Sequence, residues 1–292
     1  VAVKIQYPGI ARTIKADLRN LRLLLQPLCL TRDWQDTLTK LADIEQMLLM
    51  ETDYEQEASF GRQARLLFAE EDRVKVPKVF DDYSTRRVLT TEYLPGCHLD
   101  GFLAAAPSQA ERDRFTHLLT VATFRLYCRL RWLPADPHPG NFIFMADGRL
   151  GLIDFGCTRV MTDEDWQLSC QSIQAALDRD EPRLNRIIAR ACLFDSPQEM
   201  EPDRIETVRR GFSWFMEPWM HEGLFDFGDR AFFLRGIDNV MEMARKRYTR
   251  SVPMTIWSNR FTLGGRAFCY RLRGRCDFRK IYEQEWRTTE AP

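Results

Sequence analysis

Two carboxylates and a carboxamide stand on neighbouring segments of the sequence, at spacings that suit a hard cation. Asp136 and Asn141 enclose the segment Asp-Pro-His-Pro-Gly-Asn, and Asp154 follows in Asp-Phe-Gly. Oxygen ligands of this kind are the ones that Mg²⁺ prefers in proteins. Phosphoryl transfer needs little beyond such positioning and the neutralisation of charge. These residues therefore predict a site for Mg²⁺ and ATP.

The spacing of these residues matches the catalytic elements of protein kinases. Asp136 and Asn141 have the separation of the aspartate and asparagine in H-R-D-x-x-x-x-N, and Asp154 stands in D-F-G. We expect Asp154 and Asn141 to hold Mg²⁺, and Asp136 to accept a proton from a hydroxyl group or water. His138, between two prolines, either contacts the γ-phosphate or the nucleophile, or braces the rigid loop. We favour bracing, because a general base is already present.

A lysine near the start of the chain supplies a further element. Val1-Ala2-Val3-Lys4 resembles the V-A-I-K strand of protein kinases, whose lysine binds phosphates. Apolar residues at helical spacing predict a helix over residues 43–68, and Glu51 falls on its apolar stripe. A carboxylate on a buried face needs a partner. We therefore expect Glu51 to pair with Lys4.

Strands and a turn are predicted between these two groups of residues. Residues 74–80 indicate an edge strand interrupted by a proline, and residues 87–93 indicate a better strand. The second strand ends in a Leu-Pro-Gly turn at 94–96, which is a predicted hinge between two lobes. Glu92 and Tyr93 stand just before this hinge and are candidate nucleotide-binding residues.

The chain beyond the hinge is predicted to be mainly helical. A helix over 114–133 leads to the loop of Asp136, and a hairpin of residues 142–144 and 150–153 turns at Asp147-Gly148. Thr162 and Asp165 indicate a capping box that opens the next helix. The predicted fold is α+β and two-lobed, like a protein kinase. Its N-lobe, 1–94, is small, contains β-strands and is truncated at its start, and its C-lobe, 95–292, is larger and mainly helical.

Composition bounds the class of protein without deciding it. The 292 residues include 42 basic and 42 acidic side chains, and 45% are apolar, as in an ordinary globular protein. The balanced charge gives no reason to expect a nucleic-acid partner, and no run is long enough for a spanning helix. The eight cysteines contain no C-x-x-C pair and lie mostly in apolar or mixed helical stretches. They indicate buried thiols in a reducing compartment.

One segment has a strong local charge. Residues 244–280 hold eleven Lys or Arg against the single acid Asp277. Aromatic and aliphatic residues alternate there with arginines, which could dock on anionic lipid headgroups. A solvated helical face is the commoner explanation of such a pattern. The interleaved residues are Arg260, Phe261, Leu263, Arg266, Phe268, Tyr270, Arg271 and Arg273.

Together these motifs resemble the UbiB/aarF-domain family, atypical protein-kinase-like proteins linked to ubiquinone biosynthesis. The matching segments are Val1 to Gly9, Glu51-Thr52-Asp53-Tyr54 with Glu57-Ala58, Asp136 to Asn141, and Leu152 to Gly156. Asp53 and Glu57 turn off the predicted helix stripe, which suggests solvation or pairing between helices. The E-x-D motif of Glu51 and Asp53, absent from ordinary protein kinases, makes the match specific, and the resemblance makes Asp53 a site residue.

The resemblance implies binding of an adenine nucleotide and Mg²⁺, and ATPase activity. It also implies association with membranes that hold quinone-precursor lipids, and with enzymes of quinone biosynthesis. The anionic membrane surface is suggested by the basic segment 244–280. The expected location is the cytoplasm or a membrane periphery, mitochondrial in a eukaryote. The sequence opens inside an apparent strand without a methionine, which indicates a fragment, so a targeting segment would not be visible.

Two departures from the family stand at the start of the chain. The family's K-x-G-Q segment and alanine-rich nucleotide loop lie upstream of the lysine strand, and this sequence contains neither. No glycine-rich loop replaces them, so we expect the chain as given to bind ATP weakly or not at all, unless the native protein supplies the missing part.

Three functions compete on this sequence. The first is an ATP-hydrolysing atypical kinase, and the lack of an A-P-E motif argues against a platform for protein substrates. The second is a small-molecule phosphotransferase of the aminoglycoside or choline kinase kind, whose D-x-H-x-x-N loop Asp136, His138 and Asn141 satisfy, although that class lacks the E-x-D motif. The third is a non-catalytic, nucleotide-dependent scaffold.

Overall fold

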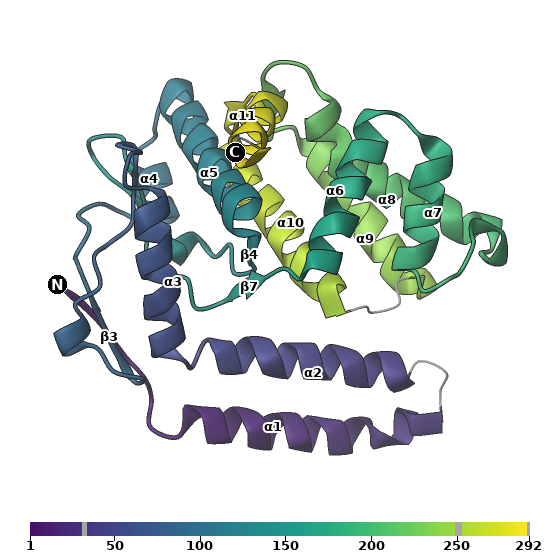
Figure 1. Ribbon diagram of the computed structural model, residues 1–292, viewed down its shortest axis with the longest axis horizontal. Helices are drawn as coiled ribbons and strands as arrows, with labels where there is room; N and C mark the ends of the chain where they lie inside the picture. Colours follow the sequence, from purple (N-terminus) through teal and green to yellow (C-terminus); the bar gives the residue numbers. More distant parts are fainter. Residues whose placement is uncertain (31–33, 249–252, 291–292) are drawn as a thin grey trace. The chain divides into compact units, whose positions relative to one another are not determined.

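The computed structural model describes residues 1–30, 34–248 and 253–290, and the chain divides into two compact units (Figure 1). The first unit comprises residues 1–106 and 134–159, and the second comprises residues 107–133 and 160–292. Every residue predicted above to bind ATP or Mg²⁺ or to act in catalysis lies in the first unit. The predicted division into lobes at residue 94 stays a prediction.

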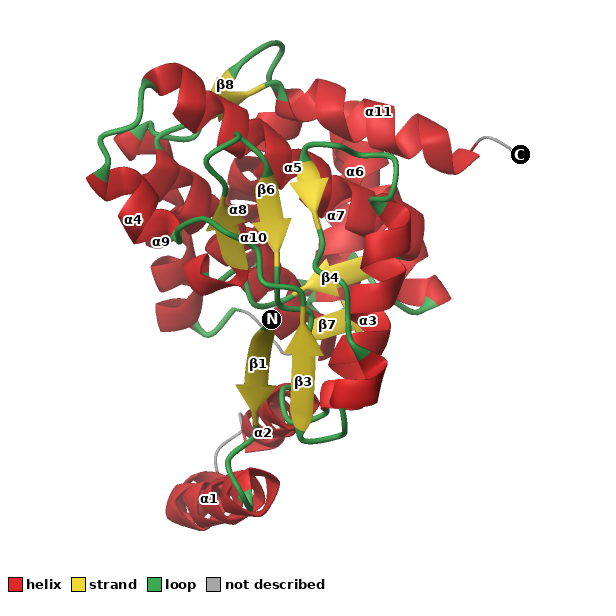
Figure 2. Ribbon diagram, turned by 90° about the vertical axis from the view of Figure 1, so that its left-hand side faces the viewer, coloured by secondary structure: helices red, strands yellow, loops and turns green. Residues whose placement is uncertain are grey.

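Short strands fix the loops of the first unit (Figure 2). β1 (Ala2–Ile5) pairs antiparallel with β3 (Val88–Thr91), and Lys4 stands opposite Leu89. β6 (Leu150–Leu152) lies between β2 (Val74–Lys75), its parallel neighbour, and β5 (Phe142–Phe144), its antiparallel neighbour. The strand predicted over 74–80 is therefore much shorter than expected. Pro77 has no N–H to donate, and Val79 pairs elsewhere, in an isolated bridge to Thr91.

Three helices stand between β1 and β2. α1 (Ile10–Leu25) and α2 (Trp34–Met50) lie side by side as a helical hairpin in Figure 1, joined by an Arg22–Glu45 ion pair of 2.7 Å. α3 (Tyr54–Leu67) begins after a turn at 51–53. The prediction of one helix over 43–68 is therefore wrong. Asp53 has an extended backbone, and its side chain accepts the N–H of Gln56 at 3.2 Å, which caps a new helix.

The predicted hairpin is confirmed, and the hinge turn lies against it. β5 and β6 are joined by a turn in which Gly148 has a φ of 84°. The backbones of Cys97 and Phe144 exchange hydrogen bonds of 3.1 and 2.7 Å. Gly96 permits this approach, because a Cβ there would stand 2.5 Å from the carbonyl oxygen of Phe144. The other helical elements of the unit are η1 (Gln26–Leu30), η2 (Asp81–Tyr83), α4 (Leu99–Ala104) and η3 (Pro139–Asn141).

The second unit is mainly helical. α5 begins earlier than predicted, because Ser108 and Glu111 form a capping box, and the capping box predicted for Thr162 and Asp165 opens α6. Its elements are α5 (Gln109–Leu130), α6 (Asp163–Leu177), α7 (Glu181–Ala191), η4 (Pro197–Glu199), α8 (Pro202–Met220), β8 (Phe225–Asp226), α9 (Arg230–Lys246), α10 (Pro253–Leu272), β9 (Arg275–Cys276) and α11 (Phe278–Glu290). The short strands β4 (Trp132–Pro134) and β7 (Thr158–Val160) each have residues on both sides of the division along the chain.

The basic segment 244–280 contributes to the core of this unit. Phe268 is buried, and Arg266 is 6% exposed. Burial lowers the pKa of Arg266 to about 10. The surface location that the interleaved pattern predicted is therefore wrong for Arg266 and Phe268. Arg271 and Arg273 are exposed, as the pattern predicted. Residues 249–252 of the segment lie outside the described residues. The rings that surround the guanidinium of Arg266 are Trp219, Phe227 and Phe278.

The cysteines are free thiols, and most are buried, as predicted. Burial raises the pKa of Cys128 and of Cys276 to about 12, which keeps both as neutral thiols. Among the described helices, none is both long enough and apolar enough to cross a bilayer.

Candidate active site

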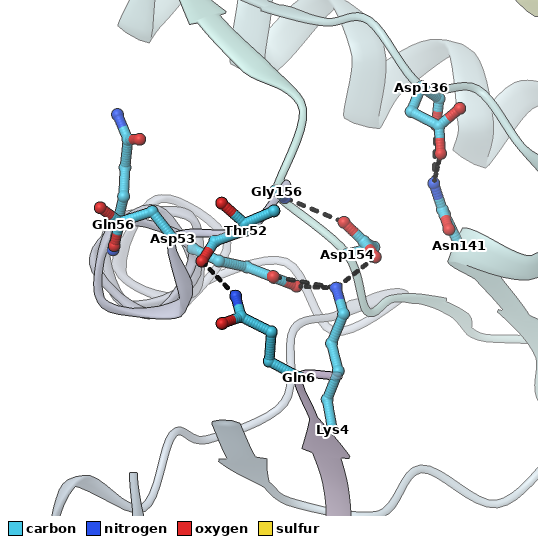
Figure 3. A network of polar contacts seen from close by, with 10 residues as sticks. Lys4, Gln6, Thr52, Asp53, Gln56, Asp136, Asn141, Asp154 and Gly156 are labelled. Atoms are coloured by element: carbon cyan, nitrogen blue, oxygen red, sulfur yellow. Dashed lines mark hydrogen bonds and ion pairs between the residues drawn. The ribbon is translucent and has the colours of Figure 1, made fainter. Parts of the chain in front are cut away.

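Lys4 is held by two carboxylates (Figure 3). Its Nζ donates to both oxygens of Glu57 at 2.9 Å and to Oδ2 of Asp154 at 3.0 Å. Lys4 extends from β1, Glu57 belongs to α3, and Asp154 follows β6. The ring of Tyr54 lies 5.1 Å from the ammonium and adds a cation–π contact. Three separate elements therefore meet at one cation.

The partner of Lys4 is Glu57, and the predicted pairing with Glu51 is wrong. The periodicity that placed Glu51 on a buried stripe assumed one continuous helix. In the structure α2 ends at Met50, and Glu51 is exposed in the turn that follows. α3 starts a new helical count at Tyr54, so Glu57 falls on its buried face, with 3% of its side chain exposed. The two explanations suggested for Glu57, solvation or pairing between helices, are wrong for the same reason, because Glu57 is buried and pairs with Lys4 of β1.

The charges of this cluster perturb one another. Burial raises the pKa of Glu57 to about 7, the negative charge of Asp154 adds to this rise, and Lys4 opposes it. Burial by itself would lower the pKa of Lys4, but the charges of Asp154 and Glu57 outweigh burial and raise that pKa above its ordinary value. Lys4 is therefore a cation at neutral pH, and Glu57 titrates close to neutrality.

The Asp-Phe-Gly segment fixes the orientation of Asp154. The backbone N–H of Gly156 donates to Oδ1 of Asp154 at 2.9 Å. Phe155 is buried, as expected for an anchor, and it packs near Gly61 of α3. A Cβ at Gly156 would lie 3.2 Å from Oε2 of Glu57 and 3.3 Å from Oδ1 of Asp154. The absence of a side chain at Gly156 therefore lets the two carboxylates approach Lys4 together.

Asn141 connects Asp136 with the segment of Asp154. Its Nδ2 donates to the backbone oxygen of Asp136 at 2.7 Å and to Oδ2 of Asp136 at 2.9 Å. Both partners are acceptors, so the amide nitrogen must face Asp136 and the amide oxygen is left for another donor or a cation. The N–H of Ile153 donates to the backbone oxygen of Asn141 at 3.1 Å. Asn141 therefore stands beside the end of β6, next to Asp154 along the hairpin.

His138 contacts its own loop. Its Nδ1 accepts the backbone N–H of Gly140 at 3.0 Å, and the helical turn of η3 begins directly after it. The neutral imidazole must then carry its proton on Nε2. The ring is exposed, so Nε2 is accessible to solvent. This hydrogen bond is compatible with the bracing role, and a contact of His138 with a phosphate or the nucleophile stays a prediction.

The E-x-D motif forms the turn that precedes α3. Asp53 caps α3, and the guanidinium of Arg86 lies 4.0 Å from its Oδ2. The side chain of Gln6, just after β1, donates to the backbone oxygen of Thr52 at 2.5 Å (Figure 3). The motif therefore ties the lysine strand to the start of the helix that carries Glu57.

The two candidates at the hinge differ in their surroundings. Glu92 accepts the backbone N–H of Lys78 at 3.1 Å and lies 3.5 Å from Arg65 and 3.9 Å from Lys75. Tyr93 is exposed. The structure thus gives Glu92 basic neighbours within the first unit, whereas Tyr93 faces solvent.

The donor set suits a Mg²⁺ ion that arrives with phosphates. No three His, Cys, Asp or Glu side chains among the described residues come together as a metal site. The amide oxygen of Asn141 and the carboxylate of Asp154 are hard oxygen donors from adjacent positions of one hairpin. In nucleotide sites Mg²⁺ takes one or two such protein ligands, and phosphates and water supply the rest. The residues present therefore fit the ion.

The first unit has the parts of a kinase-like nucleotide site: a strand lysine, a helix glutamate that pairs with it, a loop with aspartate and asparagine, and an Asp-Phe-Gly segment. Residues 1–188 match the ABC1 atypical kinase-like domain, and the chain belongs to this family. The resemblance to the UbiB/aarF-domain family and the predicted α+β, kinase-like fold are confirmed.

Similar proteins include several atypical kinases. COQ8 from the mitochondria of Schizosaccharomyces pombe is 28% identical over 238 residues, which cover 80% of this chain and 38% of COQ8. Mitochondrial COQ8B of Rattus norvegicus is 32% identical over 63% of this chain and 35% of its own length. The chloroplastic protein ACTIVITY OF BC1 COMPLEX KINASE 3 of Arabidopsis thaliana is 35% identical over 53% of this chain and 22% of its own length. The chain thus spans well under half of these relatives.

A solved structure shares the fold. The structure of Rv3197 with erythromycin, from Mycobacterium tuberculosis, superposes with a TM-score of 0.68 over 99% of this chain and 72% of that one. The two sequences are 23% identical. At this identity the likeness concerns the fold alone.

Proposed function

We propose that the chain binds Mg-ATP in its first unit and acts in an atypical kinase or ATPase that supports ubiquinone or lipid metabolism. The observation that carries the proposal is the position of Lys4 between Glu57 and Asp154, on the same unit as the Asp136–Asn141 pair. The relatives named atypical kinases support the kinase part. The UbiB resemblance supports the metabolic part.

Each side chain then has a defined task. Lys4 would hold the phosphates, and Glu57 would hold Lys4 in place. Asp154 and Asn141 would hold Mg²⁺, which neutralises phosphate charge when it is bound. Asp136 would accept the proton of the attacking hydroxyl or water, with its carboxylate oriented by the amide of Asn141. Glu51, Asp53, Glu92, Tyr93 and His138 stay candidates for contacts with the nucleotide.

The proposed setting is the surface of an anionic membrane. Quinone-precursor lipids reside in membranes, so a protein that acts on them, or on their biosynthetic enzymes, gains from peripheral association. The exposed arginines of the basic segment, such as Arg271 and Arg273, would supply part of the attraction. Two of the relatives are mitochondrial by name and one is chloroplastic.

The test is Mg²⁺-dependent phosphate release from ATP by the full-length protein, with and without anionic liposomes. Asp154→Asn is expected to reduce turnover about 100-fold or more, because the metal loses a charged ligand. Asp147→Asn, the same exchange at the exposed tip of the same hairpin, serves as the matched control and should leave turnover unchanged. A rise in turnover with liposomes would support the membrane setting.

Other outcomes separate the competing functions. An ATP-induced rise in Tm without any turnover would favour a nucleotide-dependent scaffold. Transfer of phosphate to a small hydroxylated acceptor, with little hydrolysis in its absence, would favour a small-molecule phosphotransferase. The absence of both turnover and an ATP-induced shift in Tm would overturn the proposal.

A further inference from the structure

Lys4 and Asp154 bind each other through groups that the nucleotide complex would need. An ammonium has three N–H donors. Those of Lys4 face three carboxylate oxygens, two from Glu57 and one from Asp154. Each oxygen of Asp154 has a partner as well, since Oδ1 accepts from Gly156 and Oδ2 accepts from Lys4. The group expected to bind phosphate and the group expected to bind metal are therefore bound to one another.

We propose that Lys4 and a divalent cation compete for Oδ2 of Asp154, so that the Lys4–Asp154 ion pair controls the entry of metal. The inference rests on the proposed function, in which Asp154 is a metal ligand. A divalent cation on Oδ2 would stand close to the ammonium of Lys4, and two cations at that distance repel each other strongly. Metal binding therefore requires Lys4 to move off this oxygen.

Release from Asp154 does not leave Lys4 unsupported. Glu57 still binds the ammonium through both of its oxygens, and its side chain is buried. The donor freed from Asp154 becomes available to an incoming phosphate. Metal and phosphate would then bind cooperatively. The metal would free a donor of Lys4 for the phosphate, and the phosphate would draw Lys4 away from the oxygen of Asp154 that the metal binds. The ion pair would be a checkpoint that opens when both components of the nucleotide complex arrive.

Competition predicts that removal of Lys4 strengthens metal binding. Mn²⁺ without nucleotide is the probe, and the free ion is counted by electron paramagnetic resonance. Lys4→Met should bind Mn²⁺ about tenfold more tightly than the wild type. The gain should vanish when Asp154→Asn is added. Lys15→Met removes one cation from the exposed side of α1 and should leave the affinity unchanged. Equal affinities for Lys4→Met and the wild type would overturn the inference.

Lys4→Met also removes a long-range repulsion between the ammonium and Mn²⁺, which by itself would raise the affinity a little. Ionic strength is therefore the next control. At high salt the field of a distant charge is screened, whereas direct competition for one oxygen persists. The ratio between Lys4→Met and the wild type should therefore survive about 0.5 M KCl. A ratio that collapses towards one would show that Lys4 acts only through its long-range field, against the inference.

A second measurement uses the unmodified protein, so it does not depend on the folding of a variant. The side chain of Lys4 is 41% exposed, which makes its amine accessible to a small acylating reagent. Saturating Mg²⁺ should speed acylation of Lys4 several-fold, read by mass spectrometry, because the ion pair that protects the amine is broken. Lys15 should react at the same rate throughout. An unchanged rate at Lys4 would overturn the inference.

The competition at Asp154 and the assignment of Asp154 as a metal ligand are refuted by different results. If Mn²⁺ binds, depends on Asp154 and ignores Lys4, the competition is wrong and the proposed function stands. If Asp154→Asn leaves Mn²⁺ binding unchanged in every background, Asp154 is not a metal ligand, and both the inference and the metal assignment in the proposed function are overturned.

Discussion

Removal of the ammonium of Lys4 should cost more stability at pH 8 than at pH 5. Glu57 is 3% exposed, and its pKa is raised from 4.5 to about 7, so its ionised form carries a penalty of about 3–4 kcal/mol at about 1.4 kcal/mol per unit. A group with a raised native pKa stabilises the fold below its unfolded pKa, and this contribution is lost as the pH rises through the native value.

Lys4 is the charge that opposes the rise at Glu57. In Lys4→Met the pKa of Glu57 therefore climbs further, and the loss of stability extends to higher pH. At pH 5 Glu57 keeps its proton, and we expect the variant to lose less than about 1 kcal/mol. At pH 8 the variant must either bury the charge of Glu57 without its cation or keep Glu57 protonated at a pH that favours loss of the proton, and both states cost free energy. There we expect a loss of about 2 kcal/mol, which allows for the partial exposure of Lys4.

Hydrogen exchange of the α3 amides, followed by mass spectrometry, measures the relevant opening free energy. Addition of Glu57→Gln to Lys4→Met should recover most of the loss at pH 8, because the buried charge is gone. Glu51→Gln, an exchange of the same kind at an exposed residue, should change the free energy by less than about 0.5 kcal/mol. An equal cost of Lys4→Met at both pH values, or rescue by Glu51→Gln in place of Glu57→Gln, would refute the reasoning.

Three further substitutions probe other supports of the fold. Asp53→Ala removes the cap of α3 and should lower the free energy of unfolding by about 1 kcal/mol in urea denaturation, with Asp53→Asn close to the wild type. Gly156→Ala forces a Cβ to 3.2 Å from Oε2 of Glu57 and should cost about 1–3 kcal/mol in the same assay; no loss would show that the two carboxylates move apart freely. Glu285→Ala removes the buried partner of Arg125 and Arg129 and should lower the free energy of unfolding by about 2–4 kcal/mol in calorimetry. Glu283→Ala, at a more exposed residue of α11, should cost far less, and equal costs would contradict the role of burial.

The local chemistry of the site was predictable from the sequence, because it depends on short motifs. The hairpin about Asp147-Gly148 follows from turn residues between apolar runs, and it delivers Asn141 and Asp154 to neighbouring positions. The capping box of Thr162 and Asp165 is equally local. In each case the residues that determine the structure are a few positions apart, so no knowledge of the tertiary fold is needed.

The error at Glu51 came from a helix boundary. Apolar residues continue at helical spacing through residues 43–68, so periodicity alone reads one helix. The signal for the break was present: Asp53 is a strong N-cap residue, and Glu55 and Glu57 follow it in the first turn of α3. A helix counted from that cap puts Glu57 on the same face as Tyr54 and Ala58, towards Lys4.

The burial of the basic segment was beyond local reasoning. Arg266 and Phe268 are spaced as an amphipathic surface would be, yet α8 and α11 bring Trp219 and Phe278 around the guanidinium. These contacts join residues far apart in the sequence, and cation–π contacts compensate part of the cost of burial. A single-segment pattern carries no record of such partners.

The central claim is that the first unit binds ATP through a metal held by Asp154. The most direct test is calorimetric titration of the full-length protein with ATP, in the presence and absence of Mg²⁺, for the wild type, Asp154→Asn and Asp147→Asn. We expect Mg²⁺ to strengthen ATP binding in the wild type and in Asp147→Asn, and this gain to be lost in Asp154→Asn. ATP binding that responds to Mg²⁺ equally in all three proteins, or no binding in any of them, would contradict it.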